Sequence, residues 1–221
     1  SQSPRRVAGH PILLNGAVLR VDPVTGNGVT GNPMYNPQNP SANASRIIGY
    51  GLRNPFRFTF RPGTSELWVG DVGWNTWEEV NRMTSPTPAN PVNFGWPCNE
   101  GAGRMSSYDS ANLTICESLY TDTVRPATSP YYAYNHSASV VAGDGCPTNQ
   151  GSVISAVSFY AGGSYPGSYN GALFFGDHSR NCIWAMLPGG NGLPSASNLR
   201  AFVVDPNSHP VDLAADPATG D

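Results

Sequence analysis

Apolar and polar residues alternate, or apolar residues run together, in short segments that recur along the chain, and a cluster of turn-forming residues closes each one. These segments occupy residues 16–26, 56–71, 152–163, 169–186 and 199–221. Alternation with a period of two residues is typical of strands, and the turn clusters supply the connections between them. Helical periodicity is nearly absent: only residues 75–81 offer a turn or two of helix, and they fit a strand equally well. The pattern predicts an all-β fold.

A unit made of a strand, a turn and a second strand that ends in Gly-Asp occurs more than once. Its endings are Gly70-Asp71 and Gly176-Asp177. Periods of about 40–50 residues with four strands each are typical of β-propeller blades. An antiparallel sandwich fits the spacing of the strands as well, but it explains the repeated unit less well. We therefore expect a β-propeller.

The last turn, at residues 216–220, resembles turns that elsewhere lead into a second strand, yet the chain stops at Asp221. Two to four blades do not close a ring comfortably. We therefore expect residues 1–221 to form a partial propeller that belongs to a longer protein.

Charge argues against two classes of partner. Charged residues make up 12% of the 221 residues, the formal net charge is -3, and the sequence contains no lysine. A nucleic-acid-binding or anionic-membrane surface needs a basic patch, and nothing in this composition provides one. No apolar run approaches the roughly 18 residues of a membrane-spanning helix. We expect neither nucleic acid nor a membrane span.

The four cysteines, Cys98, Cys116, Cys146 and Cys182, lack the C-x-x-C spacing of zinc and redox sites. Three pairings are open to them, and we expect Cys98–Cys116 and Cys146–Cys182. The segment around residues 98–146 would then be an insertion closed by disulfides. Disulfides persist in oxidising compartments, which indicates a secreted, extracellular or periplasmic protein.

Four motifs follow one another in order: GAVLRVDPVTGNG at residues 16–28, NPMYNP at 32–37, GYGLRNPFRFTFRPGTSELWVGDVGWNTWEEVN at 49–81 and NFGWPCNEG at 93–101. Together they resemble the glucose/sorbosone dehydrogenase family. That family comprises soluble six-bladed propellers that bind pyrroloquinoline quinone (PQQ) and calcium, and it includes the propeller of Hedgehog-interacting proteins. The resemblance implies that this chain supplies about three to four of six blades.

The resemblance assigns the quinone to Arg53 and Asn54, which match a pair that hydrogen-bonds PQQ in the family. A guanidinium offers a planar fork of donors that can grip a carboxylate or quinone oxygen. Pro55 restricts Asn54 to an extended conformation, which would fix where both side chains point. An alternative from the residues alone is that the pair hydrogen-bonds loop carbonyls and has a structural role.

The resemblance places a calcium ion at the backbone carbonyls of Gly73 and Trp74. Calcium accepts backbone oxygens along with carboxylates. Glu79 matches a family glutamate associated with a structural calcium, although Glu78 and Glu79 could equally make surface or turn hydrogen bonds. Trp74 is also a candidate for substrate contact, as is Trp77, whereas the alternating strands around Trp68 and Trp184 predict core residues.

The sequence departs from the family pattern in several places. Phe56 stands where the sugar dehydrogenases commonly carry a glutamine, and residues 208–211 offer no arginine where the enzymes use them. Arg180 is a candidate for a basic residue that reaches the quinone. The family's catalytic base is a histidine upstream of this chain. Of the histidines present, only His178, beside Asp177, has a neighbour that could orient it.

Three functions remain open. The resemblance implies a secreted quinoprotein that oxidises the anomeric carbon of aldose sugars, or related alcohols, by hydride transfer to PQQ, without a catalytic base in this chain. Its partners would be a small sugar and the remaining blades of the same protein. The alternatives are a non-catalytic secreted propeller that binds a glycan or a protein, and a structural domain of a larger extracellular polymer-degrading protein.

Overall fold

Strands make up most of the regular structure. The computed structural model describes residues 2–6, 9–216 and 218–220. The helical segments are η1 (Ser3–Arg5), α1 (Asn43–Arg46), α2 (Ser106–Ser110), α3 (Thr114–Tyr120) and η2 (Gly167–Tyr169). The strands are β1 (Ala17–Leu19), β2 (Ile47–Tyr50), β3 (Pro55–Phe60), β4 (Leu67–Asp71), β5 (Trp77–Met83), β6 (Val92–Asn93), β7 (Asn99–Glu100), β8 (Gly103–Arg104), β9 (Tyr132–Asn135), β10 (Ile154–Phe159), β11 (Leu173–Asp177), β12 (Cys182–Pro188) and β13 (Pro194–Val204). The predicted all-β class is confirmed, and residues 75–81 contribute to a strand, β5.

The chain divides into two compact units, and each is described by itself. The first contains residues 1–55 and 83–130, and the second contains residues 56–82 and 131–221. The number of propeller blades stays a prediction.

The first unit is built on a three-stranded sheet of order β1-β2-β6, with β1 antiparallel and β6 parallel to β2. All four residues of β2 are buried, because this strand lies in the middle of the sheet. The β7-β8 hairpin precedes α2 and α3. Cys116 and Leu119 of α3 form a small buried core with Cys98, and the Cys98–Cys116 disulfide lies within it. The predicted pairing of these two cysteines is confirmed.

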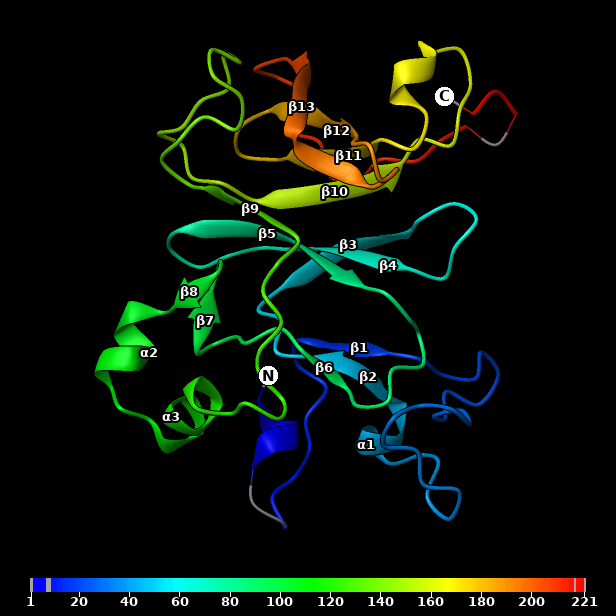
Figure 1. The fold of residues 1–221 in the computed structure, drawn as a ribbon, viewed down its shortest axis with the longest axis vertical. Coiled ribbons are helices and arrows are strands. Elements are labelled where there is room, and N and C mark those ends of the chain that lie inside the picture. Colours follow the sequence, from blue (N-terminus) through cyan, green and yellow to red (C-terminus); the bar gives the residue numbers. More distant parts are fainter. Residues whose placement is uncertain (1, 7–8, 217, 221) are drawn as a thin grey trace. The chain divides into compact units, whose positions relative to one another are not determined.

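The second unit consists of two four-stranded sheets, in the orders β3-β4-β5-β9 and β10-β11-β12-β13 (Figure 1). In the second of these sheets all four strands are consecutive in sequence, as in a propeller blade, whereas β9 joins the first sheet only after β6, β7 and β8 have intervened in the chain. The two sheets share one apolar core, in which the ring centroids of Trp68 and Phe159 lie 5.3 Å apart. Trp68 and Trp184 are fully buried, as predicted. The second predicted disulfide, Cys146–Cys182, joins the long β9-β10 connection to β12.

The repeated Gly-Asp has a packing explanation. A Cβ on Gly70 would lie 3.3 Å from Val157 Cγ1, where β4 passes close to β10. A Cβ on Gly176 would lie 3.3 Å from Ala156 Cβ. Both distances are shorter than ordinary van der Waals contact, so the absence of a side chain lets neighbouring strands approach.

Helices α2 and α3 were not expected. Their residues carry little helical periodicity beyond Ile115 and Leu119, which are four residues apart. The closed disulfide and the small core around it provide the burial that holds so short a helix, since isolated helices of this length are not stable. None of the helices in the described part of the chain is long and apolar enough to cross a membrane.

Candidate functional site

Arg53 and Asn54 belong to the first unit and follow a tightly packed turn. Gly51 has a φ of +81°, and a Cβ there would lie 2.4 Å from Asn93 Oδ1, so the close approach requires glycine. The Trp96 amide donates to the Gly51 carbonyl at 2.7 Å. The guanidinium carbon of Arg53 lies 5.8 Å from the centre of the Trp96 ring, within reach of a cation–π contact. Arg53 is half-buried and packs against Trp96, which is itself hydrogen-bonded to the turn.

Asn54 is exposed and begins the approach to β3. Pro55 follows it and disfavours helical backbone at Asn54. An arginine and an exposed amide supply the planar and neutral donors that carboxylate and quinone oxygens accept. The chemistry of this pair therefore fits PQQ.

A pair of amide side chains beneath this turn was not anticipated. Gln2 Nε2 donates to Asn93 Oδ1 at 2.8 Å, and Asn93 Nδ2 donates to Gln2 Oε1 at 3.1 Å. Gln2 Nε2 also donates to the Trp96 carbonyl at 2.8 Å. Asn93 and Trp96 are both members of the N-F-G-W motif, so the motif marked the place, but only the fold brings Gln2 to it.

Gly73 and Trp74 belong to the second unit, in the short loop between β4 and β5. Trp74 is 45% exposed, so little burial holds this loop. The Gly73 amide donates to Glu78 Oε1 at 3.3 Å, and the Thr76 carbonyl accepts from the His136 amide at 2.9 Å. Backbone carbonyls are hard oxygen ligands, so the donor chemistry fits calcium.

Glu78 and Glu79 point to opposite faces of β5, because side chains alternate along a strand. Glu78 is fully buried, with His136 Nε2 at 2.7 Å from Oε1 and the Ile154 amide at 2.8 Å from Oε2. Burial raises the pKa of Glu78, and the hydrogen bonds from His136 and Ile154 oppose the rise. Glu79 is also buried, and its Oε2 accepts from Asn81 Nδ2 at 3.0 Å. Neither side chain lies on the surface, but Glu78 makes the turn hydrogen bond of the alternative interpretation, with the Gly73 amide as donor.

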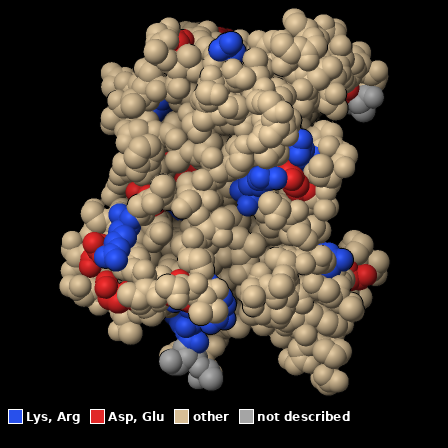
Figure 2. Space-filling model, viewed as in Figure 1, with Lys and Arg blue, Asp and Glu red and all other residues tan. Residues whose placement is uncertain are grey.

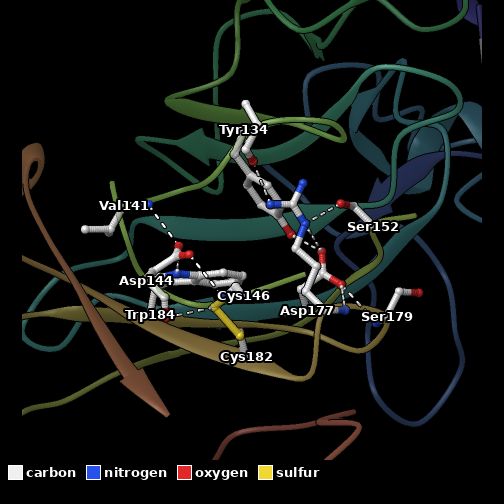
Figure 3. Close-up of a disulfide and its surroundings, with 11 residues drawn as sticks. Tyr134, Val141, Asp144, Cys146, Ser152, Asp177, Ser179, Cys182 and Trp184 are labelled. Carbon is white, nitrogen blue, oxygen red and sulfur yellow. Dashed lines mark hydrogen bonds and ion pairs between the residues drawn. A yellow bond between two sulfur atoms is a disulfide. The ribbon is translucent and has the colours of Figure 1, made fainter. Parts of the chain in front are cut away.

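Arg180 and Asp177 lie in a buried polar cluster near the second disulfide. Tyr134 donates from its hydroxyl to Asp177 Oδ2 at 2.8 Å, and the Ser152 hydroxyl lies on the other side of the cluster (Figure 3). Arg180 is fully buried: its Nε donates to Ser152 Oγ at 2.6 Å, and Nη1 and Nη2 donate to the carbonyls of Ala138 and Asn135. A quinone contact would require Arg180 to exchange these bonds, and its role as a ligand stays a prediction.

His178 does not receive the orienting carboxylate that the sequence suggested. The carboxylate of Asp177 accepts from Tyr134 and from the amides of Val153, Ser179 and Arg180. His178 is exposed. The histidine that a carboxylate does hold is His136, and no local sequence signal links it to Glu78, which is 58 residues away.

Among the described residues, no three His, Cys, Asp or Glu side chains gather closely enough to hold a metal ion. The predicted metal ligands Gly73, Trp74 and Glu79 stay predictions.

The motifs and the fold agree with one family. A family model described as Glucose / Sorbosone dehydrogenase matches residues 2–186. The chain belongs to this family. The predicted resemblance to this family is thereby confirmed. No curated protein matches the chain.

Solved structures of sugar dehydrogenases share the fold of this member of the glucose/sorbosone dehydrogenase family. The PQQ-bound form of an aldose sugar dehydrogenase from Streptomyces coelicolor is 20% identical, with 86% of this chain and 39% of that chain covered and a TM-score of 0.52. A structure described as glucose dehydrogenase is 18% identical, with 92% and 48% covered and a TM-score of 0.63. The apo-form of the soluble aldose sugar dehydrogenase from Escherichia coli is 20% identical, with 85% and 44% covered and a TM-score of 0.54. The chain spans less than half the length of each.

Phe56 stands where the resemblance implies a glutamine in the sugar dehydrogenases. Its ring is 40% exposed and lies 4.7 Å from the guanidinium carbon of Arg57. A phenyl ring has no hydrogen-bonding atom, so this position cannot replace a glutamine toward a polar cofactor.

Proposed function

We propose that the chain is part of a secreted or periplasmic quinoprotein that oxidises the anomeric carbon of aldose sugars, or of related alcohols. Membership of the glucose/sorbosone dehydrogenase family over residues 2–186 carries this proposal. The Arg-Asn pair at residues 53 and 54 gives it chemical content, and the two disulfides support an oxidising compartment.

In this proposal Arg53 and Asn54 bind the quinone, and Arg180 is a further candidate. The Gly73 and Trp74 carbonyls and Glu79 bind calcium. When bound, PQQ supplies the two-electron acceptor for the hydride that leaves the anomeric carbon, while the hydroxyl proton passes to a base. We assign that base to none of the described histidines. The proposed partners are a small sugar and further blades of the same propeller.

A non-catalytic propeller that binds a glycan or a protein partner is the second candidate. Two observations favour it: Phe56 cannot hydrogen-bond a cofactor, and the nitrogens of Arg180 already donate to Ser152, Ala138 and Asn135. Propellers host many functions, so the fold does not choose between the two candidates.

Calorimetric titration of PQQ in the presence of calcium separates the two candidates. We expect binding to the unmodified protein, and its loss after chelation of calcium. The double variant R53A/N54A should weaken PQQ binding by at least about 100-fold, because hydrogen bonds to charged groups contribute about 1.5–3 kcal/mol each.

Arg57→Ala is the matched control, since Arg57 is the next arginine along the chain and lies 3.3 Å from the exposed Asp212. It should leave PQQ affinity unchanged. Equal affinity of R53A/N54A and the unmodified protein would remove the assignment of the quinone site. If this chain binds no PQQ, the titration is repeated on the full-length protein, and a second failure to bind would favour the non-catalytic propeller.

A further inference from the structure

Glu78 joins three segments of the second unit that are far apart in sequence. Its Oε1 accepts from the Gly73 amide at 3.3 Å and lies 2.7 Å from His136 Nε2, just after β9. Its Oε2 accepts from the Ile154 amide at 2.8 Å, at the start of β10. One fully buried carboxylate therefore ties the loop between β4 and β5 to strands on both sides of it.

His136 holds the same loop a second time. Its backbone amide donates to the Thr76 carbonyl at 2.9 Å, while its ring contacts Glu78. The loop at residues 73–76 is thus fixed at its first residue through Glu78 and at its last residue through His136. Since Trp74 is 45% exposed, these polar contacts rather than burial define the loop.

We propose that Glu78 and His136 are positioning residues that set the conformation of the loop at residues 73–76. Its functional consequence, the placement of the Gly73 and Trp74 carbonyls for calcium, rests on the proposed function. The placement of the loop itself does not.

The geometry explains why a glutamate and a histidine suit this role. A carboxylate offers acceptors on both oxygens, and here both are used by donors from different segments. Glutamine has one acceptor oxygen, so Glu78→Gln must leave a buried backbone amide without its partner. His136→Phe removes the ring donor at similar size, whereas His136→Gln keeps an N–H donor. Losing a buried partner is costly because the remaining group stays desolvated.

Hydrogen exchange of the calcium-free protein tests the proposal directly. The amides of residues 73–76 should exchange at least about tenfold faster in E78Q and H136F than in the unmodified protein, since one lost buried bond corresponds to about 1–3 kcal/mol. H136Q should restore slow exchange. Glu66→Gln is the matched control: Glu66 binds Arg82 in the same unit, away from this loop, and its loss should leave these amides unchanged.

Calorimetric titration with calcium alone tests the functional consequence. Calcium affinity should fall by about tenfold in H136F and recover in H136Q, in parallel with the exchange rates. Unchanged exchange in both E78Q and H136F would overturn the proposal, as would equally fast exchange in H136Q and H136F, which would indicate packing rather than hydrogen bonding. If the unmodified protein binds no calcium, the proposed calcium site fails, and the exchange rates still decide whether Glu78 and His136 position the loop.

Discussion

At the scale of single residues, buried carboxyl groups connect the two sheets of the second unit. The Val153 amide donates to Asp177 Oδ2 at 3.0 Å, and the next amide, of Ile154, donates to Glu78 Oε2 at 2.8 Å. Two carboxylates from different strands therefore hold successive amides at the start of β10. Each of these amides therefore has a buried side-chain acceptor, and this arrangement fixes the register where β10 begins.

In the first unit, Asp122 is a carboxylate whose lowered pKa contributes to the stability of the fold. Hydrogen bonds from the Arg5 guanidinium, at 2.8 Å, and from the Arg125 amide lower the pKa of Asp122 to about 2. A lowered pKa in the folded state stabilises the protein above the ordinary value of 3.8. That contribution is lost as the pH falls through about 2.

We therefore expect Asp122→Asn to lower the free energy of unfolding near neutral pH. The difference from the unmodified protein should shrink below about pH 4 and vanish below about pH 2. Urea unfolding at several pH values measures it. Asp109→Asn is the control, because its ion pair with Arg104 is exposed. A difference that stays constant from pH 5 to pH 2 would contradict the assignment.

At the scale of elements, a disulfide and hydrogen bonds hold the connection between β9 and β10 to the second sheet. Besides the Cys146–Cys182 disulfide, Asp144 Oδ2 accepts from the Trp184 indole nitrogen at 3.1 Å (Figure 3). Arg180 adds three bonds to the same connection or its ends. A long segment with little regular structure is thus ordered by covalent and polar contacts rather than by its own strands.

Replacing both Cys146 and Cys182 by serine should lower the free energy of unfolding by about 4 kcal/mol, because the disulfide spans 36 residues and restricts the unfolded chain. The Cys98–Cys116 disulfide spans 18 residues, so replacing both of its cysteines by serine should lower the free energy of unfolding by about 3 kcal/mol. Urea unfolding without reductant compares the two variants. Equal stability of the unmodified protein and the first variant would show that the polar contacts alone hold the connection.

At the scale of the whole molecule, the sequence predicted what depends on local pattern. Strand alternation predicted the all-β class, and the two observed disulfides were the expected pairing, although spacing alone left three pairings open. The contact between Glu78 and His136 could not be predicted, because it depends on how β5 and β9 pair, with Glu78 opposite Tyr134. Gln2 beneath Gly51 is a second case, since no pattern along the chain encodes its contact with Asn93, which lies 91 positions away.

The small share of charged residues in the sequence predicts a surface with few charges. Arginines are sparse on the face in Figure 2, and most of them lie beside acidic side chains. Ion pairs in the described part of the chain include Arg104–Asp109 at 3.1 Å and Arg82–Glu66 at 2.5 Å. Paired charges leave much of the surface neutral, so apolar groups have more weight in how molecules meet.

The largest consequence concerns β3, where Phe56, Phe58 and Phe60 are 40%, 63% and 54% exposed. They share one side of an edge strand, and the rings of Phe58 and Phe60 lie 6.1 Å apart. An exposed apolar row on a sheet edge promotes association.

We expect the purified protein to self-associate as its concentration rises, and the variant F58T/F60T to self-associate less. The midpoint of thermal unfolding should be the same for both proteins, because threonine suits an exposed strand. Sedimentation velocity measures both. The double variant V24T/V124T is the control, since Val24 and Val124 are 90% and 86% exposed outside any strand and should leave association unchanged. Equal association of F58T/F60T and the unmodified protein would show that another surface is responsible.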